Sequence, residues 1–209
     1  RLVPFDYAGL PDTIQFEAIP WRSYTADVLA KLAETQARME RLHKAWTTYP
    51  GTRTIVFCVS IQHADFVCRW LGEQGIRIVA CHTGEHSADR DTALEQLERG
   101  ELDAVAAVDL FNEGIDVPLI DRVVMLRPTS SSVVFLQQLG RGLRVAEGKE
   151  RLQVIDFIGN HKTFLNKVRT LLSLAPQPVS TGTFLRGDTG TVELREGCRV
   201  NVDLEVIEM

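Results

Sequence analysis

The chain has 209 residues, of which 44% are hydrophobic and 24% charged, a composition typical of one globular domain with appendages. Its formal net charge of −5 excludes a protein that binds nucleic acid through an overall basic charge, so any such binding has to be local. No apolar run approaches the roughly 20 residues of a membrane span, and there is no signal peptide. We therefore expect no membrane partner. The four cysteines, which form no CxxC pair, favour a reduced, cytoplasmic protein.

Short apolar runs alternate with amphipathic stretches along most of the chain. The runs are typical of strands covered on both faces, and we expect Ser87 to cap a helix and Gly75 and Gly100 to end helices. In chain order, the expected elements are a strand at 13–19, a helix within 24–49, a strand at 54–60, a helix at 62–75, a strand at 76–83, a helix at 87–100, strands at 103–109 and 121–126, a helix at 131–145, a strand at 152–158 and a helix at 161–174.

This alternation predicts an α/β fold with a mainly parallel central sheet and right-handed connections. The regular pattern occupies residues 51–175, preceded by an arm or linker over 1–50 and followed by a small β-rich extension or linker, expected to be truncated, over 176–209. Ligands of such sheets bind beyond the carboxyl ends of the strands. The informative loops are therefore those that follow Ser60, Thr83, Asp109 and Leu126.

Several familiar site patterns are absent or incomplete. The segment "GLRVAEGKE" (142–150) has one residue too many for a phosphate-binding P-loop, and "GRGLRV" (140–145) lacks the third glycine of a dinucleotide fingerprint. His82 and His86 lie in a loop, where local hydrogen bonds are a better interpretation than metal ligation. The four cysteines form no CxxC pair, so we expect free thiols and no metal site.

Two segments could address a nucleotide. In "VDLFNEGIDVP" (108–118), Gly114 would let the backbone approach a ligand, and Asp116 could accept hydrogen bonds from sugar hydroxyls. In "QQLGRGLR" (137–144), Arg141 and Arg144 would share one face of a helix and could bind one phosphate through planar guanidinium groups. Taken singly, the first segment fits a turn with a capping aspartate better than a ligand site. The second fits a solvated charged face as well as it fits an anion site.

Together and in order, four segments resemble motifs of the C-terminal RecA-like domain of superfamily 2 helicases and translocases. The segment "RTIVFCVS" (53–60) is similar to motif IV, and "HTGEHSADRDTALEQLERGELDAVAAVD" (82–109) is similar to the HxG-type segment and its helix. The segment "VDLFNEGIDVP" is similar to motif V, and "QQLGRGLR" is similar to motif VI. The residue sequences "NEGID" and "LRPTSSS" are most similar to those of the bacterial DEAD/DEAH-type helicases related to the excision-repair and type III restriction groups. The resemblance covers roughly residues 51–172 and implies a RecA-like three-layer sandwich.

The resemblance implies a site for ATP and Mg²⁺ between this domain and a first RecA-like domain of the same polypeptide, which would carry the P-loop and the DExx box. Arg141 and Arg144 would reach the γ-phosphate as arginine fingers, and Gln137 would orient the phosphate or the attacking water. Gly114 and Asp116 would hold the ribose. The chain by itself is then expected to be inactive as an ATP hydrolase.

The resemblance also implies that nucleic acid, expected to be DNA, crosses the strand ends of this domain. The implied contacts are Ser60, Thr83, Gly84, Asp109, Thr129 and Ser130. Hydroxyls and backbone N–H groups bind phosphates without a large positive charge, which is compatible with the acidic composition. Val108 replaces the usual motif V threonine, and Glu113 stands where DEAD-box proteins carry arginine, which argues against the RNA-specific subgroup.

Two other functions remain open from the sequence. A RecA-like module could bind nucleic acid or protein without catalysis, since the chain lacks a P-loop. A Rossmann-type nucleotide enzyme is disfavoured by the incomplete fingerprint.

Overall fold

The computed structural model describes residues 3–12, 35–108, 119–127, 144–158, 161–172, 191–193 and 197–202. The expected strand at 13–19 and the expected helix over 131–143 lie outside this part of the chain. Within the described residues, no helix is long and apolar enough to span a bilayer.

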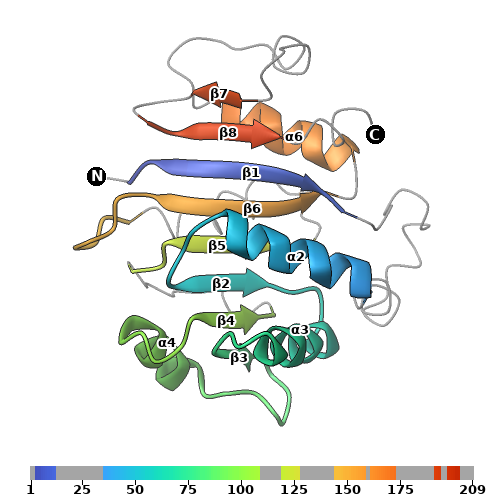
Figure 1. Ribbon diagram of the computed structural model, residues 1–209, viewed down its shortest axis with the longest axis vertical. Helices are drawn as coiled ribbons and strands as arrows, with labels where there is room; N and C mark the ends of the chain where they lie inside the picture. The colour runs from blue at the N-terminus through green and yellow to red at the C-terminus, as the bar shows by residue number, and fades with distance from the viewer. Residues whose placement is uncertain are drawn as a thin grey trace.

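An eight-stranded sheet forms the centre of the described structure (Figure 1). Its order is β3-β4-β2-β5-β6-β1-β8-β7, and every neighbouring pair is parallel except β7 and β8. In register, Thr54 of β2 lies opposite Ala104 of β4 and Arg122 of β5. The strands are β1 (Phe5–Pro11), β2 (Thr54–Phe57), β3 (Ile78–Cys81), β4 (Ala104–Ala107), β5 (Arg122–Met125), β6 (Leu152–Ile158), β7 (Thr191–Glu193) and β8 (Arg199–Val202).

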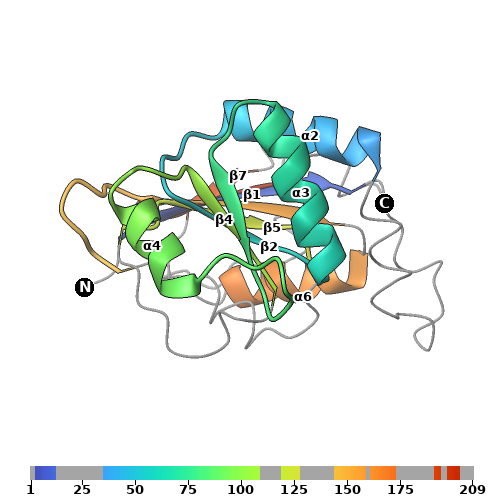
Figure 2. The ribbon, with the colours of Figure 1, turned by 90° about the horizontal axis from the view of Figure 1, so that it is seen from below.

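Helices cover both faces of the sheet (Figure 2). On one face, α2 (Gln36–Thr48) and α3 (Ile61–Glu73) pack on alternate strand residues such as Val56 and Val124. On the other face, α4 (Arg90–Glu98) and α6 (His161–Leu172) pack on the intervening residues, such as Val123. Because both faces are covered, most side chains of the central strands are apolar, as expected for a buried parallel sheet. The buried polar exceptions are Thr54, Arg122, Gln153 and Asp156. The predicted α/β three-layer architecture is confirmed.

The predicted elements from residue 54 to residue 107 and the strand at 152–158 are all present, with bounds that differ by a few residues at most. Gly75 and Gly100 follow their helices with φ angles of 84° and 72°, the left-handed conformation expected of a residue that ends a helix. The predicted cap of α4 was wrong. Asp89 accepts from the backbone N–H of Thr92 at 2.9 Å, whereas the Ser87 hydroxyl accepts from the backbone N–H of His82.

Two further differences concern the ends of the pattern. Residues 5–11, expected to belong to an arm, form β1 inside the sheet between β6 and β8. The helix expected at 131–145 does not include its last two residues, because Arg144 forms an isolated β-bridge and Val145 is not helical. The strand β8, from the predicted β-rich extension, joins the same sheet. The division of the chain into domains otherwise stays a prediction.

Candidate nucleic-acid and nucleotide interface

Ser60 lies directly beyond the carboxyl end of β2 and caps α3. Its hydroxyl oxygen accepts from the backbone N–H of His63 at 3.2 Å, and the residue is only 5% exposed. The cap satisfies one of the free N–H groups of the helix terminus. Ser60 therefore holds the start of α3.

Thr83 and Gly84 follow β3 in a loop that is shaped by His82. The buried His82 ring accepts from the Gly84 backbone N–H through Nδ1 at 3.0 Å, so the ring proton is on Nε2 and points to the Asp65 carboxylate, also at 3.0 Å. A Cβ atom at Gly84 would lie 3.0 Å from His82 Nδ1, which explains the glycine. The interpretation of His82 as a locally bonded loop histidine is confirmed, and Thr83 is left exposed at this edge.

The structure brings these two strand ends to one edge of the sheet. β2 and β3 are separated only by β4, and all three strands are parallel. With neighbouring strands about 4.8 Å apart, the ends of β2 and β3 are roughly 10 Å from one another. The structure thus places the buried Ser60 and the exposed Thr83 at the same edge of the sheet.

Arg144 is exposed to solvent. Among the described residues, no group of three or more His, Cys, Asp or Glu side chains could hold a metal ion. The remaining predicted site residues lie outside the described part of the chain, namely Gly114, Asp116, Asp109, Thr129, Ser130, Gln137 and Arg141.

A buried polar cluster at the same edge was not predicted from the sequence. Arg38 of α2 is 1% exposed and forms a bidentate pair with Asp12, with Nε–Oδ1 at 2.9 Å and Nη2–Oδ2 at 2.8 Å. Its Nη2 also donates to the carbonyl oxygen of Leu126 at 2.7 Å. The guanidinium carbon lies 5.8 Å from the ring centroid of Phe157. One side chain therefore contacts residues at the carboxyl ends of β1, β5 and β6.

His63 extends this cluster to the loop after β2. Its Nδ1 accepts from the backbone N–H of Val59 at 3.2 Å, and its Nε2 lies 3.3 Å from Arg38 Nη1. Burial, with the nearby positive charge of Arg38, lowers the pKa of His63 to about 3. The ring is therefore neutral at physiological pH.

A sequence signal for this cluster existed. Arg38, Leu42 and Ala45 follow one another at i, i+4 and i+7, so they share the face of α2 that is buried. An arginine on an otherwise apolar helix stripe predicts a buried partner, because an unpaired charge is too costly to bury. The identity of that partner could not be read from the sequence, since Asp12 is 26 positions away.

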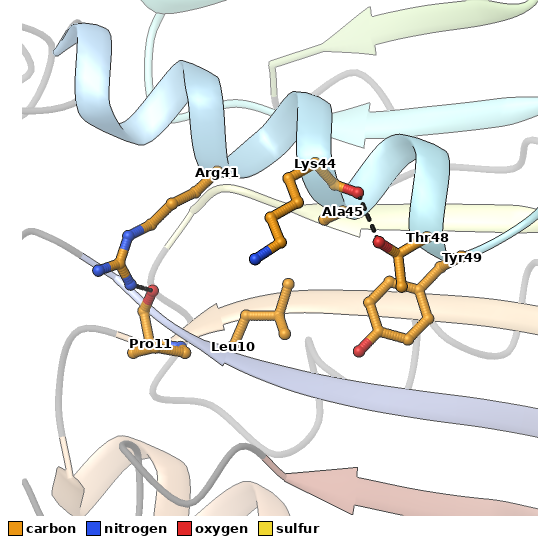
Figure 3. Close-up of a pocket in the computed structure, with 7 residues that line it drawn as sticks. All are labelled: Leu10, Pro11, Arg41, Lys44, Ala45, Thr48 and Tyr49. Atoms are coloured by element: carbon orange, nitrogen blue, oxygen red, sulfur yellow. Dashed lines mark hydrogen bonds between the residues drawn. The ribbon is translucent and has the colours of Figure 1, made fainter.

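A basic groove runs between α2 and β1 beside this cluster (Figure 3). It has a volume of about 350 Å³, and the described residues of its lining include two cationic side chains, Arg41 and Lys44, and no carboxylate. Arg41 donates to the carbonyl oxygen of Pro11, the last residue of β1, at 3.1 Å. The groove thus begins at the carboxyl edge of the sheet.

The sequence matches the family described as Helicase conserved C-terminal domain over residues 37–146, which is 110 of the 209 residues. The chain belongs to this family. The helicase C-terminal domain accounts for the sheet from β2 to β5, and the match also reaches Arg38, Ser60 and Thr83.

Curated relatives agree with this assignment. This helicase C-terminal domain is 30% identical over 121 residues to IRC3 of Saccharomyces cerevisiae, whose name describes an ATP-dependent helicase; the match covers 58% of the chain and 18% of IRC3. It is 24% identical over 151 residues to UvrABC system protein B of Prochlorococcus marinus, covering 70% of the chain and 20% of that protein. The chain therefore spans about a fifth of the length of these relatives.

Solved structures show the same fold. A fragment assigned to the HsdR subunit of a type I restriction enzyme from Vibrio vulnificus superposes with a TM-score of 0.58 at 25% identity, over 76% of this chain and 32% of that one. The C-terminal domain of the DEAD-box protein Dbp5 superposes with a TM-score of 0.56 at 15% identity, over 99% of this chain and 95% of that one. The resemblance to a superfamily 2 RecA-like C-terminal domain is confirmed.

Proposed function

We propose that this helicase C-terminal domain is the second motor unit of an ATP-dependent DNA helicase or translocase. The observation that supports this most strongly is the family match over residues 37–146, which includes the parallel strand ends where Ser60 and Thr83 meet at one edge. A polypeptide that also contains a first RecA-like domain would complete the nucleotide site. Closure of the two domains on ATP and reopening after hydrolysis would move the protein along a strand.

The role of this chain at the nucleotide is to supply positive charge. Arg141 and Arg144 would stabilise the charge that develops on the transferred phosphoryl group, with Gln137 orienting the phosphate or the water and Gly114 and Asp116 holding the ribose. The exposure of Arg144 fits a phosphate presented by another domain. Bound Mg²⁺ would neutralise phosphate charge, and we assign its ligands to the first domain.

The proposed strand track consists of Ser60, Thr83 and Gly84, continued by Asp109, Thr129 and Ser130. Hydroxyls and backbone N–H groups at strand ends and at the N-terminus of α3 would bind successive phosphates. DNA is preferred as the substrate because the relatives include UvrABC system protein B and a type I restriction subunit. DEAD-box RNA helicases are also among the relatives, so the test includes both nucleic acids.

The nucleotide assignment is tested with Arg141→Ala in the longer polypeptide that contains the first RecA-like domain. Loss of an arginine finger should lower DNA-stimulated ATP hydrolysis by about 10³-fold or more, with an unchanged urea unfolding curve. Arg99→Ala is the matched control, because Arg99 is exposed and lies at the end of α4. Parental turnover in the Arg141 variant would refute the assignment.

The strand track is tested with Thr83→Ala in the same polypeptide, by fluorescence anisotropy with single-stranded DNA and RNA of equal length. We expect weaker binding of DNA and little change for Thr47→Ala, an exposed threonine on α2. Strong nucleic-acid binding by a parental protein that shows no ATP turnover would instead support a non-catalytic binding module.

A further inference from the structure

The Arg38 guanidinium lies where four adjacent strands end. Its partner Asp12 follows β1 and donates its own backbone N–H to the carbonyl oxygen of Ile158 at the end of β6. Leu126, which accepts from Arg38 Nη2, follows β5 and donates its N–H to Phe57 at the end of β2. The order β2-β5-β6-β1 makes these ends consecutive along one edge of the sheet.

His63 connects this guanidinium to the segment that leads to Ser60. Its ring accepts from the backbone N–H of Val59, and its backbone N–H donates to the Ser60 hydroxyl. A neutral imidazole has one acceptor nitrogen, so with Nδ1 accepting from Val59 the ring proton is on Nε2, which lies 3.3 Å from Arg38 Nη1. The guanidinium is therefore in direct contact with the ring that holds the segment after β2.

A buried ion pair is a poor way to gain stability. Removing two charges from water costs hydration free energy, and their mutual attraction seldom outweighs this cost. Replacing both partners by apolar residues is therefore often neutral or stabilising. The fork of Arg38 does provide fixed directions, since its planar N–H groups bond Asp12 and Leu126 at defined angles. The ion pair can thus fix the relative positions of the segments that it bonds, which an apolar pair cannot do.

We infer that Arg38 and Asp12 are positioning residues of the nucleic-acid track, which hold the segment carrying Ser60 and the end of β5 at the spacing needed by a bound strand. The inference rests on the proposed function. Arg38 is fully buried, so it acts on the ligand through Leu126 and His63 and not by direct contact. The ligand is the phosphate backbone of a single strand crossing these ends.

The decisive variant replaces both charges, as Asp12→Leu with Arg38→Met, in the longer polypeptide. This pair of substitutions leaves no unpaired buried charge, so the unfolding midpoint should stay close to the parental value. The apparent KM for single-stranded DNA in stimulated ATP hydrolysis should rise about tenfold, while kcat at saturating DNA is retained, because the track is misplaced but the nucleotide site is not. The Kd from anisotropy should rise in parallel.

Two further variants test whether a change in the KM for DNA comes from the planar fork of Arg38 or from any substitution on this helix. Arg38→Lys keeps the charge but loses the planar fork, so it should raise the KM for DNA as the double variant does. Arg41→Lys, three residues further along the same helix and exposed in the basic groove, should leave the KM unchanged (Figure 3).

The outcomes are distinguishable. A stable double variant with parental KM and Kd for DNA would overturn the inference and leave the proposed function standing. A parental protein that binds neither DNA nor RNA at low salt would refute the proposed function, and the inference would be refuted with it. A raised KM in the stable double variant, with Arg41→Lys unaffected, supports the positioning role.

Discussion

Acidification should weaken this domain through His63. The pKa of the buried ring is lowered to about 3 from the ordinary 6.5, by burial and by the charge of Arg38, so the unfolded chain takes up a proton well before the folded one. The contribution of His63 to stability is complete above pH 6.5 and is lost as the pH falls from 6.5 to 3. This direction follows because the charged form is favoured only after unfolding.

The magnitude follows from the two pKa values. Each pH unit in this window costs about 1.4 kcal/mol, so the free energy of unfolding should fall by about 2 kcal/mol between pH 7 and pH 5 from this one residue. The full window, down to pH 3, corresponds to roughly 5 kcal/mol. A loss of that size is a large part of the 5–15 kcal/mol typical of a domain.

Urea unfolding followed by far-ultraviolet circular dichroism, at pH 7 and at pH 5, measures this loss. In His63→Asn, the asparagine keeps an acceptor near the position of Nδ1, facing Val59, but does not titrate. Between pH 7 and pH 5 the free energy of unfolding of this variant should therefore fall by about 2 kcal/mol less than that of the parent. His86→Asn is the matched control, because His86 is exposed. Equal losses in the parent and in His63→Asn would refute the reasoning.

Three other predictions test buried groups. Arg122→Met should lower the free energy of unfolding by about 3 kcal/mol in urea titrations. The reason is that the guanidinium donates three hydrogen bonds and its central carbon lies 3.8 Å from the ring centroid of Trp46. Lys167→Met should cost about 3–5 kcal/mol in the same assay, since it removes the cation 2.6 Å from the buried Asp156 carboxylate, and adding Asp156→Asn should recover part of the loss. Burial, with nearby acidic groups, raises the pKa of Cys68 to about 12 from 9.0. Because the thiolate is the reactive form, alkylation of Cys68 by iodoacetamide at pH 8 should be about 1000-fold slower in the native chain than in urea. Mass spectrometry measures both rates. Comparable alkylation rates of Cys68 in the native chain and in urea would contradict its assignment. A Lys167→Met variant with the parental free energy of unfolding would contradict the assignment of Lys167.

The elements that the sequence predicts well are those with local signals. The strand at 152–158 is mostly apolar, with Gln153 and Asp156 as its polar residues, and it has the predicted bounds. The end of α3 is marked by Gly75, whose φ of 84° suits glycine. By contrast, β1 reads "FDYAGLP", with a glycine and a proline in seven residues, and its burial depends on β6 and β8 flanking it.

The candidate site was predictable in part for the same reason. Ser60 and Thr83 follow apolar strand runs, so their place at the carboxyl edge follows from the order of elements. The cluster around Arg38 depends on two side chains and one backbone carbonyl, from residues 25 to 88 positions away, that meet only after the sheet has formed. Such a cluster leaves only the indirect signal of a charge on a buried helix face.

The position of β1 has a consequence for how the domain is made. It is the first of the described strands to be synthesised, yet its partners in the sheet, β6 and β8, are among the last. Tyr7 of β1 and Asp156 of β6, which share a hydrogen bond of 2.7 Å, are 149 positions apart. At about 5–20 residues per second, a ribosome needs roughly 7–30 s to bridge that distance. During this interval the nascent β1 has two unpaired edges, so the domain has to finish folding late in translation.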